Sequence, residues 1–543
     1  MPPHSLQDEG VNDLEQKLGD AEVRPPSPPP MSASPPRLLV IGAGSRGRTY
    51  ASCSIQSSNG VVAAVAEPDD YKREDFGRKF IWGKLTTPPD GSSFKGWKEY
   101  VAWELNRRER HKSGEAVPEG IDAVFICVQD EMHRDVIMAL APLGLHIMCE
   151  KPLATTLDDC TDIYRTLAPL QDTKVFSIGH VLRYSPHNMM LRKLLLEDNV
   201  IGDIVSVHHT EPVGFWHFSH SFVRGNWRKE STSAPSLLTK SCHDIDLLLW
   251  FLCSPAPGSD APAHIPSSVT STGAVQFFRK SRKPKEAGNA TNCLSCPAEN
   301  DCLYSSKKIY VGTKHRGVGT GNIRWPVSIV VPDIESFGSD IDSAKAAMLS
   351  KLAEDYDSST PQDVVSSRNW FGRCVFESDN DVCDEQVVVM TWDDDSPLHS
   401  SGTLQGPSGG RGAKQAVFHM IAQTKKQCQR YSHIYGTEGE IYADSKTITI
   451  EDFRTGETKT YEPQLESLGH GGGDHGLART FVLAVDKVKN GGWEAERAQR
   501  ELIGCSLEEI IRSHAMVFAA EEARRDKKTI DCNAWWNKNI GTT

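Results

Sequence analysis

A glycine-rich turn directly after a short apolar run constrains the fold of this chain more than any other feature. The apolar run, residues 38–41, breaks into glycines at positions 42, 44 and 47. Gly42 permits a tight turn out of a strand, Gly44 lets the backbone approach a pyrophosphate, and Gly47 lets the following helix pack closely on the sheet. The start of that helix offers free N–H groups and the positive end of its dipole to phosphates. The turn therefore predicts a dinucleotide site.

A carboxylate completes this pattern. Glu67 directly follows a second apolar run, residues 61–66, and lies 25 positions beyond Gly42. An acid about 20 residues after the glycine turn accepts the ribose hydroxyls of a dinucleotide. Glu67 favours NAD as the cofactor, because a carboxylate repels the extra phosphate of NADP. Lys72 and Arg73 follow closely, so NADP remains an alternative.

The chain divides into segments of different character. Residues 37–152 alternate strand and helix patterns, which predicts an α/β domain with a doubly wound parallel sheet of the Rossmann type. Residues 153–530 read as a strand-rich α+β domain, with a Cys-rich insert around 287–310 and a polar insert around 333–369. Residues 1–36 are rich in Pro and Ser and predict a disordered tail. Residues 531–543 are expected to form a C-terminal tail.

Length and charge limit the function classes. A chain of 543 residues exceeds one core and suggests more than one domain. The net charge of −12, without a long basic run, argues against nucleic acid as the main partner. No apolar stretch approaches the roughly 18 residues that span a bilayer, and no secretory signal is visible. We therefore expect no membrane partner and a cytoplasmic location, where the 14 cysteines would be thiols or metal ligands.

A second motif lies at the end of a further predicted strand. The tripeptide Glu150-Lys151-Pro152 follows residues 146–149, and ligands bind at the carboxyl ends of strands in open α/β sheets. With the glycine turn, the stretch 179–186 and the sequence Cys-His-Asp-Ile-Asp at 242–246, the chain resembles the Gfo/Idh/MocA oxidoreductases over roughly residues 37–525. The resemblance implies a Rossmann domain followed by an α+β domain whose large open sheet is mostly antiparallel.

The resemblance also implies roles for individual residues. Lys151 is expected to contact the nicotinamide and the substrate hydroxyl, and His243 is the expected acid/base residue. Histidine titrates near neutrality, and a held lysine can polarise an oxygen or relay a proton. Outside such a context, a lysine before proline is usually solvated and a histidine opening an apolar helix is usually structural. The cofactor is expected to lie against Gly42, Gly44, Ser45, Arg46, Gly47, Glu67, Val128, His133, Glu150 and Lys151.

One position departs from the family pattern. Many members carry an aspartate one helical turn before the catalytic histidine, but here that position is Thr239. Threonine cannot act as the anionic partner of a histidine. Asp246 is a candidate substitute or a structural residue, and Lys240 becomes an additional candidate contact. The expected substrate residues are Arg183, Tyr184, Trp227, Lys240, Asp246 and His470.

The segment before His243 looks like the subgroup related to streptomycin-biosynthesis oxidoreductases, which act on cyclitols or sugars. Arg224, Trp227 and Arg228 would suit polyhydroxylated or anionic substrates through stacking and forked hydrogen bonds. A buried aromatic residue and solvated arginines explain the same pattern equally well.

The Cys-rich insert suggests a metal. Cys293, Cys296 and Cys302 form a compact C-x2-C-x5-C pattern whose thiolates could share one tetrahedral zinc. Three ligands do not close a structural site, so a fourth is required, with Cys374 as the best candidate. Cys383, Cys253 and His315 are weaker ones. An iron–sulfur cluster and three reduced thiols remain alternatives.

A late glycine cluster, residues 469–476, contains His470 and resembles a loop near the family's substrate cleft, although a surface loop is the alternative.

The sequence therefore indicates an NAD(P)-dependent dehydrogenase that oxidises a secondary alcohol of a cyclitol, sugar or sugar derivative. Two other functions stay open. One is an NAD-dependent glycosidase of the same fold, and the other is a non-catalytic cofactor sensor. The expected assembly is a homo-oligomer formed through the C-terminal sheet.

Overall fold

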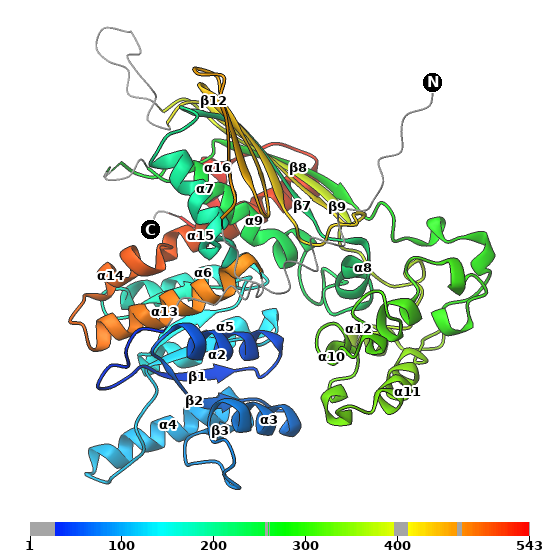
Figure 1. Cartoon of the computed structure of the whole chain (residues 1–543), viewed down its shortest axis with the longest axis horizontal. Coiled ribbons are helices and arrows are strands. Elements are labelled where there is room, and N and C mark those ends of the chain that lie inside the picture. The colour runs from blue at the N-terminus through cyan, green and yellow to red at the C-terminus, as the bar shows by residue number, and fades with distance from the viewer. Residues whose placement is uncertain (1–27, 256–258, 260, 396–410, 464–469, 542–543) are drawn as a thin grey trace.

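A computed structural model gives the fold, and it describes residues 28–255, 259, 261–395, 411–463 and 470–541. Figure 1 shows two β-sheets with helices packed on them and a mainly helical segment to one side. Most of the tail predicted for residues 1–36 lies outside the described residues. The α/β class, with a parallel N-terminal sheet and a separate C-terminal sheet domain, is confirmed.

The N-terminal sheet is parallel throughout, with the strand order β3-β2-β1-β4-β5-β6. Its strands are buried on both faces, as expected where crossover helices cover a parallel sheet. They are β1 (Arg37–Ile41), β2 (Val61–Ala66), β3 (Ser93–Phe94), β4 (Ala123–Ile126), β5 (His146–Cys149) and β6 (Phe176–Ile178). The helices between them are α2 (Ser45–Ser57), α3 (Asp70–Phe80), α4 (Trp97–Lys112), α5 (His133–Leu140) and α6 (Leu157–Leu167). Because β6 pairs with β5, this sheet extends past residue 152, where the sequence placed the domain boundary.

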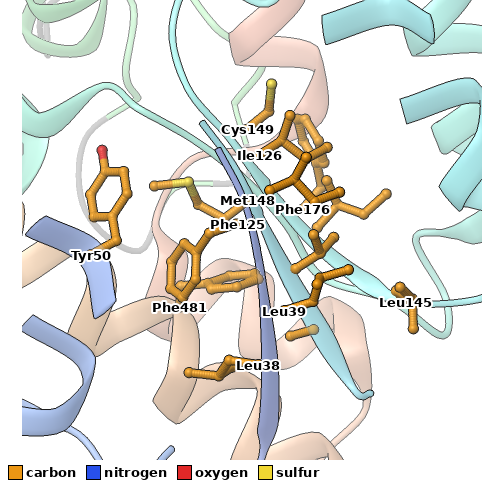
Figure 2. Packing of buried hydrophobic residues seen from close by; sticks show 14 of the residues in the cluster. Leu38, Leu39, Tyr50, Phe125, Ile126, Leu145, Met148, Cys149, Phe176 and Phe481 are labelled. Atoms are coloured by element: carbon orange, nitrogen blue, oxygen red, sulfur yellow. The ribbon is translucent and has the colours of Figure 1, made fainter. Parts of the chain in front are cut away.

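A helix from the far end of the chain completes the core of this domain. Helix α13 (Gly473–Lys489) packs against α2. In Figure 2 its Phe481 lies against Phe125 of β4, and the two ring centroids are 5.4 Å apart. Phe125 also stacks on Tyr50 at 5.5 Å. The core of the nucleotide-binding domain therefore depends on a helix that begins roughly 300 positions after β6, the last strand of its sheet.

The second sheet has nine strands in the order β14-β13-β12-β11-β7-β10-β9-β8-β15. Its pairs are antiparallel except for β7 with β10, so the expected mostly antiparallel open sheet is observed. The strands are β7 (Ile204–Pro212), β8 (Ser268–Ala274), β9 (Glu385–Trp392), β10 (Lys414–Ile421), β11 (Tyr431–Gly436), β12 (Gly439–Asp444), β13 (Ile448–Asp452), β14 (Thr458–Tyr461) and β15 (Ile530–Asp531). Alternate residues are buried along β9 and β10, because only one face carries helices. Those helices are α7 (Pro186–Leu196), α9 (Ser236–Leu252) and α15 (Leu507–Asp526).

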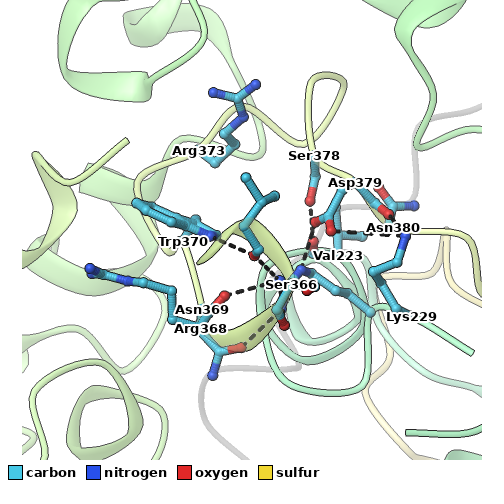
Figure 3. A network of polar contacts seen from close by, with 12 residues as sticks. Val223, Lys229, Ser366, Arg368, Asn369, Trp370, Arg373, Ser378, Asp379 and Asn380 are labelled. Carbon is cyan, nitrogen blue, oxygen red and sulfur yellow. Dashed lines mark hydrogen bonds and ion pairs between the residues drawn. The ribbon is translucent and has the colours of Figure 1, made fainter. Parts of the chain in front are cut away.

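The segment between β8 and β9, residues 275–384, forms a third unit with its own apolar core, which we call the insert. It contains α10 (Val327–Val330), α11 (Ile341–Leu352) and α12 (Gln362–Ser367). Figure 3 shows part of the polar network that holds it to residues 223–229. In that network Arg228 Nε pairs with Asp379 at 2.7 Å, and Arg228 Nη2 donates to Val365 O at 2.8 Å. The two inserts expected from the sequence are therefore parts of one unit.

The expected C-terminal tail is instead a helix, α16 (Cys532–Asn539). Trp535 is buried in the core of the second domain, and its Nε1 donates to Glu522 of α15 at 2.6 Å. Burial of this aromatic side chain explains why the segment is ordered. Among the described residues, no helix combines the length and the apolarity required to cross a bilayer.

Candidate functional site

A cavity of about 1770 Å³ lies between the two domains and the insert. The carboxyl ends of β1, β2, β4 and β5 form its floor, as open α/β sheets place their ligand sites. Helix α9 and the segment before β11 form the opposite wall. Predicted site residues on its lining are Gly42, Gly44, Ser45, Arg46, Glu67, Val128, Glu150, Lys151, Trp227, Lys240, His243 and His470.

The glycine turn has the geometry that a dinucleotide requires. Gly42 has a φ of 95°, and a Cβ there would lie 2.4 Å from Cys127 O. At Gly47 a Cβ would lie 2.0 Å from Gly42 O, so the helix could not approach the turn. A Cβ on Gly44 would meet no protein atom within 4 Å and would project into open space. This open space at the start of α2 fits a pyrophosphate.

Glu67 is buried beside this turn. Its Oε2 accepts from Ala43 N at 2.8 Å and its Oε1 accepts from Asp69 N at 3.0 Å. Each oxygen keeps a further lone pair, so the carboxylate can still accept ribose hydroxyls. Arg73 donates to Glu67 O at 2.6 Å and pairs with Asp70, whereas Lys72 lines the cavity. Lys72 is therefore the better placed cation for a 2′-phosphate.

Arg46 joins the end of β5 to α13 beneath the turn. Its Nε pairs with Glu150 Oε1 at 2.7 Å, and its Nη2 pairs with Asp474 Oδ1 at 2.8 Å. Tyr50 also donates to Glu150. Burial alone would raise the pKa of Glu150, but Arg46 and Tyr50 lower it overall, so this carboxylate stays charged. Asp474 also contacts His470 Nδ1 at 3.2 Å.

Lys151 lies where the domains meet. Its Nζ donates to Thr239 O of α9 at 2.5 Å. Thr239, which stands where many family members carry an aspartate, therefore contributes its backbone oxygen to this contact. Nearby, Trp227 Nε1 donates to Asp130 Oδ2 at 2.8 Å, again across the domain boundary. Burial raises the pKa of Asp130. These contacts place the lysine and the tryptophan at the cavity that also holds the glycine turn.

His243 is buried and has an unexpected partner. Arg430 Nη2 lies 2.7 Å from its Nε2, and Asp244 Oδ2 lies 3.2 Å from the same atom. Arg430 can only donate, so Nε2 accepts and Nδ1 carries the proton. Burial lowers the pKa of His243 well below its usual value, and the charges of Arg430 and Lys151 lower it further against the opposing effect of Asp244. The imidazole is therefore neutral at neutral pH, and its buried Nδ1 has no hydrogen-bond partner in the part of the chain that the structure describes.

A neutral network of two cations and two anions supports this histidine. Lys240 Nζ pairs with Glu211 Oε1 at 2.5 Å, and Arg430 Nε pairs with Glu211 Oε2 at 3.0 Å. Arg430 also pairs with Asp244, which accepts from His209 Nε2 at 3.2 Å. The sequence pattern did not predict site roles for Glu211, Arg430, Asp244 and His209. Asp244 was adjacent to a predicted residue, whereas Glu211 and Arg430 could be found only from the pairing of β7 with β11.

Five predicted cofactor or substrate residues are not on the lining of this cavity: Gly47, His133, Arg183, Tyr184 and Asp246. His133 Nδ1 contacts Pro152 O at 2.7 Å and holds the chain after Lys151. Asp246 forms a bidentate pair with Arg183, at 2.7 and 2.9 Å, and Tyr184 donates to Ile503 O at 2.8 Å. Asp246 therefore neutralises a buried arginine and does not take the place of the missing aspartate. Of the arginines weighed for the substrate, Arg228 binds the insert, and Arg224 is also buried.

The expected zinc site is not supported. Among the described residues, no group of three or more His, Cys, Asp or Glu side chains is arranged to hold a metal ion, and this includes the four candidate cysteines, Cys293, Cys296, Cys302 and Cys374. Cys293 Sγ instead lies 3.4 Å from Arg224 Nη2. Burial raises the pKa of Cys302 and of Cys374, which favours their thiol form. Both side chains pack against the apolar core of the second domain.

Comparisons with known proteins agree with this geometry. The profile "Oxidoreductase family, NAD-binding Rossmann fold" of the Gfo/Idh/MocA proteins matches residues 37–180, and "Oxidoreductase family, C-terminal alpha/beta domain" matches residues 193–257. The insert lies outside both matched ranges.

Among curated relatives, the putative oxidoreductase YteT of Bacillus subtilis is 22% identical over 68% of this chain and 73% of its own length. An inositol 2-dehydrogenase of Rhizobium meliloti is 36% identical over 44% of this chain and 58% of its own length. A 2,7-anhydro-N-acetylneuraminate hydratase of Mediterraneibacter gnavus is 24% identical over 28% of this chain, and the match spans only 37% of that protein.

Solved structures with the same fold include an inositol dehydrogenase homolog of Azotobacter vinelandii complexed with NAD+. Its TM-score is 0.56, at 13% identity over 92% of this chain and 98% of that one. A levoglucosan dehydrogenase complexed with NADH and levoglucosan gives a TM-score of 0.53, at 14% identity over 92% of this chain and 100% of that one.

Proposed function

The chain belongs to the Gfo/Idh/MocA oxidoreductase family, and from this premise we propose that it is an NAD-dependent dehydrogenase acting on a secondary alcohol of a cyclitol, sugar or sugar derivative. One observation carries the proposal. Lys151, at the end of β5, binds Thr239 of α9 within the cavity that also contains the glycine turn. A lysine in this position can contact an alcohol whose carbon faces a bound nicotinamide.

The residues that would hold the cofactor are the glycine turn, Glu67 and Lys151. Gly44 leaves room for the pyrophosphate and Glu67 has lone pairs for the ribose. When bound, the cofactor supplies the hydride acceptor. Glu67 supports NAD over NADP, because its carboxylate lies where a 2′-phosphate would be bound.

Two protein groups are proposed to act on the substrate oxygen. Lys151 offers its Nζ, and His243, which also lines the cavity, has a buried Nδ1 that lacks a partner among the described residues. The Nε2 of His243 already accepts from Arg430, so the imidazole positions and polarises the oxygen rather than taking its proton. We assign the proton transfer to Lys151 Nζ, which as a neutral amine would take the hydroxyl proton with its lone pair while one of its N–H groups donates to Thr239 O.

The substrate class rests on the lining of the cavity and on the relatives. Trp227 offers an apolar ring, while Lys240 and His470 offer donors and acceptors for hydroxyl groups. Relatives named for inositol support a polyol. The levoglucosan complex supports a sugar derivative equally well.

A dehydrogenase assay tests the proposal. Purified protein with NAD would be offered inositols, aldoses and amino-cyclitols, and NADH formation would be followed by absorbance. We expect net NADH from at least one of them, and we expect Lys151→Met to lower kcat by about 100-fold or more while NADH affinity stays within a few-fold. Lys112→Met, which removes an exposed lysine outside the cavity, is the control and should retain activity.

The outcomes separate the three functions. Glycoside cleavage without net NADH would favour the glycosidase. Tight NADH binding without turnover of any polyol would favour the sensor. Full turnover by Lys151→Met would contradict the assignment of this lysine.

We also propose that the protein forms a homo-oligomer through the free face of the nine-stranded sheet. Tyr435, His433 and Tyr442 stack there, with ring centroids 3.9 and 4.0 Å from His433, and Tyr442 is exposed. Light scattering of Tyr442→Glu against the unaltered protein would test it, with a smaller assembly expected for the variant. The structure describes all 14 cysteines and none of them forms a disulfide, which supports our proposal of a reducing compartment such as the cytoplasm.

A further inference from the structure

The insert borders the same cavity as the glycine turn, although the matched family ranges do not include it. Its contribution comes mainly from one stretch, residues 325–332, through Trp325, Ser328, Ile329 and Pro332. None of the residues proposed above to bind NAD or the substrate lies in this stretch. The insert packs around its own apolar core, to which the second domain adds Trp216.

Contacts hold this stretch along the cleft at both ends. At one end the Trp325 ring lies against His217 and His220, with centroid distances of 5.1 and 5.5 Å. At the other end Glu335 Oε2 lies 3.7 Å from Arg48 Nη2, across the domain boundary. Arg48 Nε in turn donates to Ala43 O of the glycine turn at 3.1 Å. The stretch therefore runs from the wall of the substrate region to the phosphate-binding turn.

Ile329 is the one apolar residue of α10 whose side chain is exposed. Val327 and Val330 are fully buried in the insert core, whereas the Ile329 side chain is 40% exposed and lines the cavity. Glu67, Pro68 and Lys72 of the Rossmann domain, with residues 95–99, line the same cavity. A ribose bound by Glu67 places the adenosine half of the dinucleotide against this wall.

We infer that Ile329 and Pro332 form a second wall of the adenosine site, so that the insert is part of the cofactor-binding apparatus. This inference rests on the proposed NAD-binding function. An aliphatic side chain and a proline ring can cover one face of a purine and remove both surfaces from water, which favours binding. Glu335 lies 3.7 Å from Arg48, whose guanidinium also pairs with Asp75, and this places the cover beside the glycine turn.

Binding measurements on fragments of the cofactor test the inference. Ile329→Ser in the full chain should weaken NADH and ADP-ribose alike, by about fivefold to tenfold, since most of one apolar contact is lost. Nicotinamide mononucleotide, which lacks adenosine, should bind the variant and the unaltered protein equally. Ile341→Ser is the matched control, because Ile341 is also 40% exposed and on the insert but does not line the cavity.

The outcomes are distinguishable from those for the proposed function. If the unaltered protein binds NADH and ADP-ribose but Ile329→Ser binds them equally well, the inference is wrong and the dehydrogenase proposal stands. If the unaltered protein binds neither, both fail. A second variant, Glu335→Lys, places like charges at Arg48, and we expect NADH to dissociate several-fold faster in stopped-flow fluorescence. An unchanged dissociation rate would show that the insert is not held over the cofactor.

Discussion

At the residue scale, the three glycines of the turn serve two different purposes. Gly42 and Gly47 are required by the protein's own backbone, since a Cβ at either position would lie 2.4 Å or less from a carbonyl oxygen. Gly44 is not, because the space beside it contains no protein atom within 4 Å. Only the ligand requires Gly44, and this difference can be measured.

Gly44→Ala should therefore leave folding intact and impair the cofactor. We expect a melting temperature within about 2 °C of the unaltered protein, since the φ of −73° at Gly44 is one that alanine adopts and the only expected cost is the modest preference for glycine over alanine at a helix N-cap. NADH affinity should fall by more than about tenfold, because the methyl group occupies space for the pyrophosphate. Calorimetric titration measures the affinity.

Gly47→Ala is the contrasting variant, and it should lower stability by about 2 kcal/mol or more through the clash with Gly42 O. Loss of stability by Gly44→Ala of the same size would refute the division of roles. So would unchanged NADH binding by that variant.

The low pKa of His243 gives a second prediction at this scale. Burial is its largest cause, and the positive charge of Arg430 adds to it. Arg430→Gln removes that charge and leaves Asp244 beside the ring, so the pKa of His243 should rise. The acid limb of the pH profile of kcat/KM should then move upward toward neutral pH, because a protonated ring adds a positive charge near Lys151, the residue assigned to accept the proton.

NMR titration of the histidine ring would measure this shift directly. Arg454→Gln, at an exposed turn after β13, should leave the profile unchanged. An acid limb at the same pH in Arg430→Gln and the unaltered protein would show that Arg430 does not control this group.

The sequence predicted those site residues that belong to local motifs. Gly42, Glu67 and Lys151 each follow a strand, so their place at the carboxyl edge of the sheet could be derived from the pattern alone. Glu211 and Arg430 could not, because the register of β7 against β11 brings them to His243 and Lys240. Arg183 and Asp246 looked like substrate residues by their place in the family motif, but they satisfy each other's charge.

At the element scale, the Arg183–Asp246 pair joins α9 to the segment between β6 and α7. Both side chains are buried, and Glu509 of α15 also contacts Arg183 at 3.0 Å. Asp246→Asn leaves the arginine without its bidentate partner. We expect a loss of about 3 kcal/mol in the free energy of unfolding, measured by chemical denaturation at pH 7.

The pH dependence has a definite sign. Burial alone would raise the pKa of Asp246, but Arg183 lowers it below its usual value. Its stabilising effect is therefore present above the unfolded pKa of about 4 and is lost as the pH falls through the folded value. The difference between Asp246→Asn and the unaltered protein should shrink below about pH 4.

Asp198→Asn, which breaks the exposed pair with Lys193, is the control and should cost less than about 1 kcal/mol. A cost for Asp246→Asn as small as that of the control would show that the buried pair contributes little.

Helices and strands with a clear hydrophobic pattern were predicted from the sequence. Elements whose formation or sheet assignment depends on tertiary packing were not. The buried strands β1, β2, β4 and β5 occupy the residues that the apolar runs indicated. Residues 176–178 also read as a strand, but only pairing with β5 assigns them to the first sheet. The helix at 532–539 was not expected, because burial of Trp535 against α15 stabilises it rather than any local pattern.

At the scale of the whole molecule, the insert joins the two domains into one ligand-binding unit. NADH should therefore lower hydrogen exchange in residues 325–335 as well as in the glycine turn. Helix α11 lies on the insert away from the cavity and should show no change, which provides an internal control. Protection confined to the Rossmann domain would contradict the assembly of the site from three parts.

The division of the chain into a Rossmann domain and an open-sheet domain could be predicted from the sequence, because each has its own periodicity. The packing of the insert could not, since it depends on a few contacts such as Arg48 with Glu335 and Trp325 with His217. Nothing in the spacing of those residues relates them to the glycine turn.

The packing of α13 on α2 has a consequence for the order in which the protein is made. The ribosome releases the strands of the nucleotide-binding sheet first, but the apolar face that Phe481 covers stays open until α13 emerges. During translation, the first domain must wait for most of the second before its core can close. The nascent Rossmann strands therefore remain a client for chaperones over some 300 further residues.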